Sequence, residues 1–326
     1  MESQLENLKS RILDCHDFES LAIEVFQYQA ANNLVYSRYL DLLNVAPQKI
    51  SNTSQIPFLP VEAFKSNKVV TGEFSSEAIF KSSGTSNSQN RSEHHIKSID
   101  WYHEVSVRIY NEIVGRVEDS RWFGLLPGYS NESSLVAMVK NFMNISDSEE
   151  SFYMNDFQGM EEELCRSTNP VVIGVTHAIL QWLESVAGSV QNLTIIETGG
   201  MKGHGREPVR SEVHSRIKSV FPEAQILSEY GMTELLSQAY SLDGKHFEPP
   251  KWMRVLIKDT ADPMTELERG RTGRVQIIDL ANIDSCSFIS TSDLGRKEPK
   301  DGSNRFEILG RFDHSEVRGC NLLSVN

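Results

Sequence analysis

The residues with the clearest chemical potential lie in one short segment, Ser228-Glu229-Tyr230-Gly231-Met232-Thr233-Glu234. Its side chains include a ring that can stack on adenine, a hydroxyl that can reach a phosphate and a carboxylate that can hold Mg²⁺. A predicted strand ends just before it, at Leu227, and open α/β sheets bind ligands at the carboxyl ends of their strands. Alternatively, Thr233 caps a helix with an acidic first turn, but this leaves the rest of the string unexplained.

A second segment, Ser82-Ser83-Gly84-Thr85-Ser86, follows a short strand predicted at 78–81. Gly84 allows backbone N–H groups to approach a phosphate closely, and the flanking hydroxyls add donors. The segment lacks the Lys of a Walker loop, and Arg91 is the first cation after it. Taken alone, it also fits a surface turn rich in Ser and Asn.

Two downstream segments offer further polar groups. Asp293, in Thr291-Ser292-Asp293-Leu294-Gly295, could accept hydrogen bonds from both hydroxyls of a ribose. Arg311, in Gly310-Arg311-Phe312-Asp313, offers a guanidinium donor. A Gly-Arg turn with a surface ion pair is the alternative for this last segment.

The composition limits the partners of the chain. It has 326 residues and a formal net charge of −13, which disfavours binding to nucleic acid or anionic lipid. Its four cysteines are far apart, which predicts reduced thiols rather than disulfides or a zinc site. The N-terminus is polar and no apolar run is long enough for a membrane helix, so we expect a cytoplasmic protein.

Hydrophobic periodicity predicts an α/β fold with a largely parallel sheet. The predicted helices cover 1–45, 99–114, 134–142, 178–186 and 207–220, and the predicted strands cover 122–126, 171–175, 193–200 and 225–227. From about residue 250 the pattern changes to strands at 253–258 and 273–279, typical of a small antiparallel subdomain. We therefore expect an α/β core over 1–250 and a β-rich subdomain over 251–326.

In their order and spacing, the four segments resemble the nucleotide-handling motifs of the adenylate-forming enzymes, which activate a carboxylic acid with ATP as an acyl-adenylate. The resemblance implies that Tyr230 stacks on adenine, Thr233 reaches the α-phosphate and Glu234 holds Mg²⁺. The ATP-binding residues that it implies are Ser82, Ser83, Gly84, Thr85, Ser86, Gly199, Gly200, Tyr230, Gly231, Met232, Asp293 and Arg311. In the wider family a second domain of about a hundred residues follows, and we expect it to be missing or cut away here.

Three further strings resemble the LuxE-type acyl-protein synthetases, a branch close to the phenylacetate–CoA ligases. They are Leu125-Leu126-Pro127-Gly128-Tyr129, Gly174-Val175-Thr176-His177 and Glu197-Thr198-Gly199-Gly200-Met201-Lys202-Gly203. The resemblance implies the large N-terminal domain of the adenylate-forming type, with mostly parallel sheets flanked by helices. It also implies that a fatty acyl group passes from its adenylate to a Cys near the C-terminus.

Cys320 is the candidate for that thiol, because Arg318 could lower its pKa and Gly319 allows the backbone to swing. An inert Cys near a chain end is the alternative. Lys202 follows a Gly pair from which it could reach a carboxylate or phosphate, or it belongs to a solvated basic loop. His94 and His95 could reach the acyl or phosphate end, although such a pair is more often a surface feature.

The sequence therefore predicts an acyl-protein synthetase that uses ATP and Mg²⁺. Within enzymes, the alternatives are an aryl- or acyl-CoA ligase and an acyl donor to a carrier protein. A nucleotide-binding partner subunit without turnover is the alternative of another class. Family relatives work with an acyltransferase and a reductase, which makes such proteins the expected partners.

Overall fold

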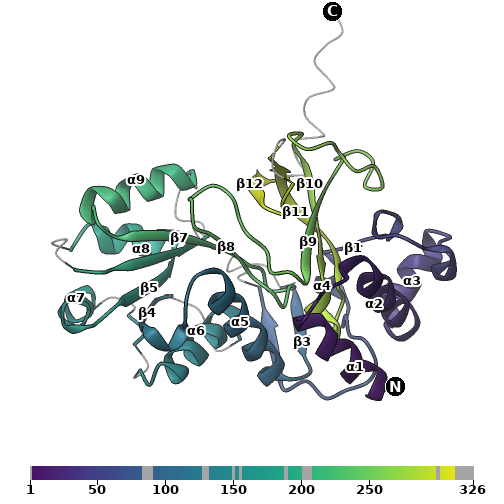
Figure 1. The fold of residues 1–326 in the computed structure, drawn as a ribbon, viewed down its shortest axis with the longest axis horizontal. Helices are drawn as coiled ribbons and strands as arrows, with labels where there is room; N and C mark the ends of the chain where they lie inside the picture. Colours follow the sequence, from purple (N-terminus) through teal and green to yellow (C-terminus); the bar gives the residue numbers. More distant parts are fainter. Residues whose placement is uncertain are drawn as a thin grey trace, which may run out of the picture.

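The computed structural model describes residues 2–82, 91–126, 132–148, 151–153, 156–186, 190–199, 208–298 and 302–312. Two five-stranded sheets and a two-stranded hairpin lie among helices, as Figure 1 shows. Within the described ranges, every helix is too short or too polar to cross a lipid bilayer.

The first sheet has the strand order β4-β5-β6-β7-β8. Its strands are β4 Arg121–Leu125, β5 Pro170–Val175, β6 Thr194–Thr198, β7 Gln225–Tyr230 and β8 Ala239–Ser241. The strands from β4 to β7 run parallel, and β8 pairs antiparallel with β7. Strand β5 is buried along its whole length, as expected for a parallel strand covered on both faces.

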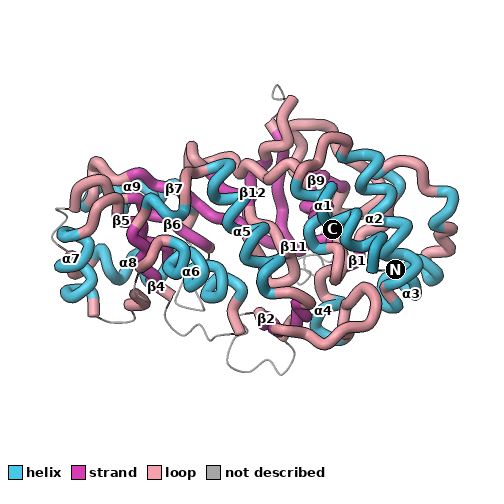
Figure 2. The backbone as a smooth tube through the Cα atoms, turned by 60° about the horizontal axis from the view of Figure 1, so that its bottom comes forward, coloured by secondary structure: helices cyan, strands magenta, loops and turns pink. Residues whose placement is uncertain are grey.

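Helices cover both faces of this sheet (Figures 1 and 2). They are α5 Ile99–Ile113, α6 Ser134–Ile145, α8 Thr176–Leu183 and α9 Arg210–Val220, with α7 Phe157–Arg166 beside them. Beneath α5 and α6, the ring of Trp122 lies 5.0 Å from that of Tyr110 and 4.9 Å from that of Phe142. Trp182 of α8 stacks on Phe221, directly after α9, with ring centroids 5.1 Å apart. The alternation of strand and helix that the sequence predicts is confirmed.

The second sheet is mainly antiparallel. Its strands are β9 Met253–Lys258, β10 Gly273–Asp279, β11 Phe288–Lys297 and β12 Phe306–Arg311, and β1 Leu59–Pro60 joins β11 in parallel. A separate hairpin pairs β2 Ala78–Lys81 with β3 Glu93–Ile96, next to the short helix α4 Ala63–Ser66. The 3₁₀ turns are η1 Pro47–Lys49, η2 Thr53–Gln55, η3 Val117–Asp119 and η4 Leu280–Asn282. An antiparallel sheet after residue 250 is therefore confirmed.

The N-terminal helices begin where the sequence offers capping side chains. They are α1 Glu2–Leu13, α2 Phe18–Asn32 and α3 Leu34–Leu42. Asp17 accepts a hydrogen bond from the backbone N–H of Ser20, and Asn33 accepts one from that of Tyr36. Each cap satisfies a donor that a helix start leaves unpaired, so α2 begins directly after Asp17 and α3 directly after Asn33.

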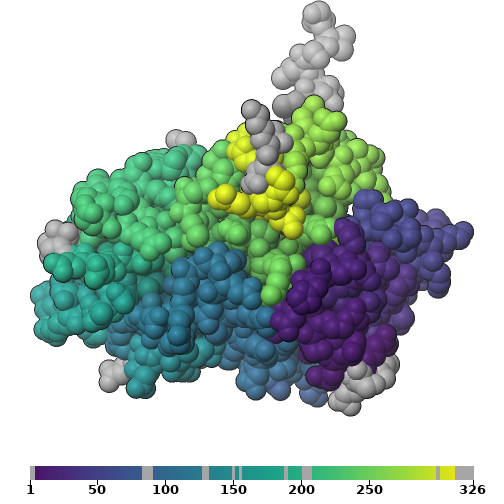
Figure 3. Space-filling view, viewed as in Figure 1, coloured from purple at the N-terminus to yellow at the C-terminus, as the bar shows by residue number. Residues whose placement is uncertain are grey.

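These helices pack against the second sheet, more than 200 residues away in the chain. The side chain of Gln29 is fully buried, and its Nε2 lies 3.0–3.3 Å from the carbonyls of Asn282, Ile283 and Ser285. Its Oε1 accepts the N–H of Ser287 at 2.9 Å. Figure 3 shows the N-terminal residues, in purple, beside the green part of the chain that holds this sheet. The boundary expected at residue 250 stays a prediction.

Strand β7 is longer than the sequence suggests. The prediction that it ends at Leu227 was wrong, because Ser228, Glu229 and Tyr230 pair with β8. The alternative that His94 is a surface residue is not observed, because His94, on β3, is buried with 1% exposure. In both places long-range contacts keep polar residues inside the fold.

Candidate active site

The segment after β7 is anchored by a carboxylate of the other sheet. One oxygen of Asp279, at the end of β10, accepts the backbone N–H groups of Leu236 and Ser237 at 2.9 and 2.8 Å. Its other oxygen accepts the Ser237 hydroxyl at 2.7 Å. Residues 231–238 therefore connect β7 to β8 without forming a helix, and the alternative of Thr233 as a helix cap is not observed.

Thr233 and Glu234 are held by a buried pair, His94 and Asn282. The Nδ1 atom of His94 lies 2.7 Å from the carbonyl oxygen of Thr233, and its Nε2 lies 3.0 Å from Oδ1 of Asn282. The Nδ2 atom of Asn282 donates to the carbonyls of Glu234 and Cys286 at 2.8 and 2.9 Å. This pair fixes the backbone at both residues expected to touch phosphate and metal.

The charge state of His94 follows from its surroundings. Burial lowers the pKa of His94 to about 4, so the imidazole is neutral at pH 7. A neutral imidazole has one N–H, whereas the ring faces two acceptor oxygens. His94 therefore donates to either Thr233 or Asn282 at any moment. The short contact to the carbonyl favours donation to Thr233.

Glu234 is linked through Ser92 to Ser82, the described residue of the Ser82–Ser86 segment. Burial raises the pKa of the Glu234 carboxyl, while a hydrogen bond with Ser92 and the charges of Arg311 and Lys65 oppose that shift. Ser92 in turn donates its N–H to the Ser82 hydroxyl at 3.0 Å. The expected phosphate-binding residues Ser83, Gly84, Thr85 and Ser86 lie outside the described residues.

The fit of this site to Mg²⁺ depends on one carboxylate. Among the described residues, no group of three His, Cys, Asp or Glu side chains is placed to hold a metal ion. Mg²⁺ usually keeps several waters and takes only one or two carboxylates together with substrate phosphates. Glu234 suits this mode, because a cation beside it would favour the charged form that burial disfavours.

The expected ribose-binding residues come together around Tyr230. The Tyr230 hydroxyl donates to Oδ2 of Asp293 at 2.7 Å, and Oδ1 of Asp293 lies 3.6 Å from Nε of Arg311. Strand pairing places Asp293 opposite Arg311 on β11 and β12. The Tyr230 ring contacts Phe247 and Phe306 at 5.6 and 5.5 Å. One hydrogen bond and one ion pair thus link three residues from separate motifs.

Two buried carboxylates, Glu197 and Glu229, were not assigned a role from the sequence. Glu197 accepts the Thr176 hydroxyl at 2.6 Å. Burial raises the pKa of Glu229 to about 7, and the charge of Glu197 adds to this effect. A side chain at position 231 would collide with Oε1 of Glu229, which explains Gly231. The positions of Glu197 and Glu229 at the ends of adjacent strands would have been the signal in the sequence.

Several expected site residues lie outside the described residues, namely Gly200, Lys202 and Cys320. Gly199 follows β6, and a Cβ there would meet no other atom within 4 Å. Of the other cysteines, Cys286 is buried, and burial raises its pKa to about 12. Burial also raises the pKa of Cys15. Neither of these two thiols is poised as a nucleophile.

Comparison with known proteins finds solved structures with a similar fold. No protein-family model matches the sequence, and no curated protein matches it. ATP-bound MatB from Rhodopseudomonas palustris has a TM-score of 0.52 and 16% identity, over 72% of this chain and 48% of that chain. A 2-hydroxyisobutyryl-CoA ligase in an open conformation with 2-HIB-AMP and CoA has a TM-score of 0.68 and 12% identity. This match covers 91% of this chain and 70% of that chain.

The same ligase in its thioesterification state gives a TM-score of 0.69 and 13% identity, over 95% of this chain and 68% of that chain. The chain thus spans about half of the MatB chain and about two thirds of the other ligase. Identities this low show the fold alone. The chain has the fold of an adenylate-forming domain, as the sequence predicts.

We expect a double-mutant cycle to reveal the coupling of His94 and Asn282. Replacing either with Ala should lower the free energy of unfolding by about 2 kcal/mol, since buried carbonyls lose their donors. The loss of unfolding free energy in the double variant should be smaller than the sum of the two single losses, by a coupling energy of about 1 kcal/mol. Denaturant titration gives the free energy of unfolding of the parent, the two single variants and the double variant. The control is the same cycle with His95→Ala in place of His94→Ala, because His95 contacts Ser76 instead. Additive losses for His94→Ala and Asn282→Ala would contradict the coupling.

Glu229 should make stability depend on pH. Its pKa is raised from 4.5 to about 7 in the folded protein, so its stabilising effect is complete below pH 4.5 and lost as the pH rises through 7. The free energy of unfolding of Glu229→Gln should therefore rise by about 3 kcal/mol relative to that of the parent as the pH increases from 4.5 to 8. Thermal or urea unfolding across this range tests it. The exposed Glu248→Gln serves as the control, and parallel pH curves for parent and Glu229→Gln would refute the expectation.

Proposed function

We propose that this protein activates a carboxylic acid with ATP as an acyl-adenylate and then passes the acyl group to a thiol. The observation that carries the proposal is the convergence of Tyr230, Asp293 and Arg311 with Glu234 in the fold of an adenylate-forming domain. Solved structures with this fold hold ATP, 2-HIB-AMP and CoA, which supports the same class of ligands here.

The polar groups suit the parts of a nucleotide. The Asp293 carboxylate can accept hydrogen bonds from ribose hydroxyls, while the Tyr230 hydroxyl holds its orientation. Burial strongly raises the pKa of Tyr230, so its hydroxyl keeps the proton that it donates to Asp293. Thr233 and Glu234 face the phosphates in this proposal, and the His94–Asn282 pair keeps their backbone in place.

In the first half-reaction, a carboxylate oxygen of the substrate attacks the α-phosphorus of ATP. The bond from that phosphorus to the bridging oxygen breaks, and pyrophosphate leaves with the electron pair. Mg²⁺ held by Glu234 would supply positive charge to the phosphoryl oxygens. Preorganised donors, among them the Thr233 hydroxyl, stabilise the charge that develops on those oxygens.

In the second half-reaction, a thiolate attacks the acyl carbon of the adenylate and AMP leaves. We propose Cys320 as the acceptor and Lys202 as a cation near the reacting carboxylate, with a fatty acid as the substrate. Arg318, two residues before Cys320, favours the thiolate. Coenzyme A or a carrier protein is the alternative acceptor, favoured by the presence of CoA in the 2-hydroxyisobutyryl-CoA ligase structure. An acyltransferase and a reductase are the expected partners.

ATP–pyrophosphate exchange with a panel of aryl and fatty acids tests the first half-reaction. We expect acid-dependent exchange by the parent protein and at least a hundredfold lower rate for Glu234→Gln, which cannot hold Mg²⁺ as a carboxylate. Glu248→Gln, an exposed position, should exchange normally. Absence of exchange with every acid, while ATP still binds, would replace the proposal with a non-catalytic nucleotide-binding subunit.

The acceptor is tested by mass spectrometry of the protein after incubation with ATP and the acid that supports exchange. We expect one acyl group on the parent and none on Cys320→Ser, with exchange unchanged because adenylation precedes transfer. Cys165→Ser, which removes an exposed thiol, should still be acylated. Covalent acylation of Cys320→Ser would exclude Cys320, and acyl-CoA formation in its place would make coenzyme A the acceptor.

A further inference from the structure

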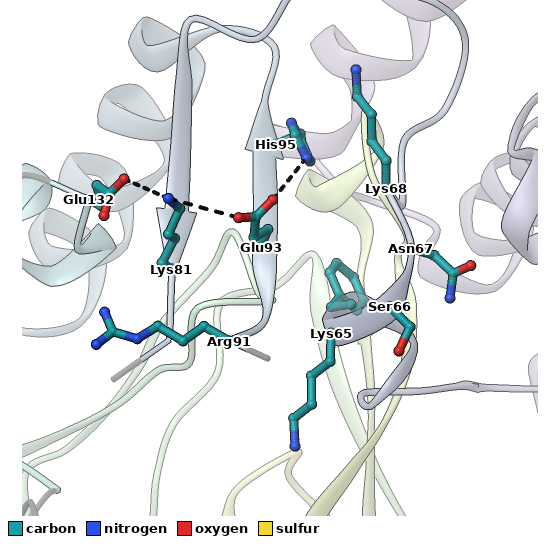
Figure 4. Close-up of a pocket in the computed structure, with 10 residues that line it drawn as sticks. Lys65, Ser66, Asn67, Lys68, Lys81, Arg91, Glu93, His95 and Glu132 are labelled. Atoms are coloured by element: carbon teal, nitrogen blue, oxygen red, sulfur yellow. Dashed lines mark ion pairs between the residues drawn. The ribbon is translucent and has the colours of Figure 1, made fainter. Parts of the chain in front are cut away.

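A polar cleft of about 580 Å³ lies between α4 and the β2–β3 hairpin. Figure 4 shows Lys65 and Lys68 on one wall and Lys81 and Arg91 on the other. The charged residues that line it are Lys65, Lys68, Lys81, Arg91, Glu93 and Glu132. Four cations and two carboxylates leave two positive charges here, in a chain whose net charge is −13. The cleft is thus a region of local positive charge on an acidic protein.

These cations differ in their ion pairs with the described residues. Lys81 lies 2.8 Å from Glu132 and 3.8 Å from Glu93, and the hydrogen bond with Glu132 raises the pKa of Lys81. By contrast, no ion pair links Lys65, Lys68 or Arg91 to another residue of the described ranges. In Figure 4 the amines of Lys65 and Lys68 point to opposite ends of the cleft, so the positive charge extends along it.

The cleft reaches the candidate active site. Lys65 acts electrostatically on Glu234, and Arg91 adjoins Ser92, which forms a hydrogen bond with Glu234. A ligand in the cleft would therefore lie next to the carboxylate proposed to hold Mg²⁺. Phe64 is the apolar side chain among the residues that line the cleft, so an acyl chain would find little apolar surface there.

We propose that this cleft binds a diphosphate group, through Lys65, Lys68 and Arg91. The amines and the guanidinium stand on flexible side chains around a polar cleft, so they can turn toward one highly charged anion held between them. Two sources carry this group in the proposed reaction: the pyrophosphate released by adenylation, and the diphosphate of coenzyme A. The proposal rests on the proposed function for its ligand, but the cleft itself can be tested without catalysis.

Isothermal titration calorimetry with inorganic pyrophosphate and, separately, with coenzyme A provides the test, with neither ATP nor acid present. We expect the parent to bind pyrophosphate, and Lys68→Gln combined with Arg91→Gln to bind it at least tenfold more weakly. Lys68→Arg should retain binding because it keeps the charge. Lys49→Gln, at an exposed position outside the residues that line the cleft, should bind as the parent does. Circular dichroism establishes that each variant is folded.

The outcomes separate the ligand sources and the two proposals. Weaker binding of pyrophosphate alone by the double variant identifies the leaving group as the ligand, and weaker binding of coenzyme A alone identifies the acceptor. Equal binding by parent and double variant, or no binding of either ligand by the parent, overturns the cleft proposal. Pyrophosphate binding that depends on Lys68, in a protein that shows no exchange with any acid, would retain the cleft and reject the proposed function.

Discussion

The architecture depends on one buried polar turn, residues 279–287, between β10 and β11. All of its residues are buried, so its backbone donors and acceptors need partners inside the protein. Gln29 satisfies three carbonyls and one N–H, and Asn33 donates to the carbonyl of Ser285 at 2.8 Å. Lys9 pairs with Asp284 of the same turn at 2.7 Å. Side chains from the first 33 residues thus stabilise a turn that begins at Asp279.

The same turn also positions the candidate site. Asp279 accepts two N–H groups of the segment after β7, and Asn282 donates to the carbonyl of Glu234. His94 completes the arrangement by linking Asn282 with Thr233. A change in the packing of the N-terminal helices would therefore reach Thr233 and Glu234 through hydrogen bonds. The segment from Gly231 to Gln238 is held by these hydrogen bonds although it contains neither helix nor strand.

Charge is distributed unevenly around this support. Buried carboxyls gather at the ends of β6 and β7, where burial raises the pKa of Glu229 and Glu234. Two cations act on Glu234 from other elements, Lys65 on α4 and Arg311 on β12. An acidic protein can bind an anionic nucleotide by such local placement, because charges within a few ångströms outweigh the distant net charge in a partly buried site.

Local pattern was enough to predict the α/β class, the central strands and most helices, since burial imposes a period of two or 3.6 residues on each element. The motif strings also selected Tyr230, Asp293 and Arg311, which the fold brings into contact. Periodicity carries no information about partners far along the chain. Only the tertiary structure decided that β7 continues to Tyr230, that His94 is buried against Thr233, and that Gln29 supports the turn after β10. Each of these depends on a long-range hydrogen bond, whose energy comes from pairing polar groups that the folded protein hides from water.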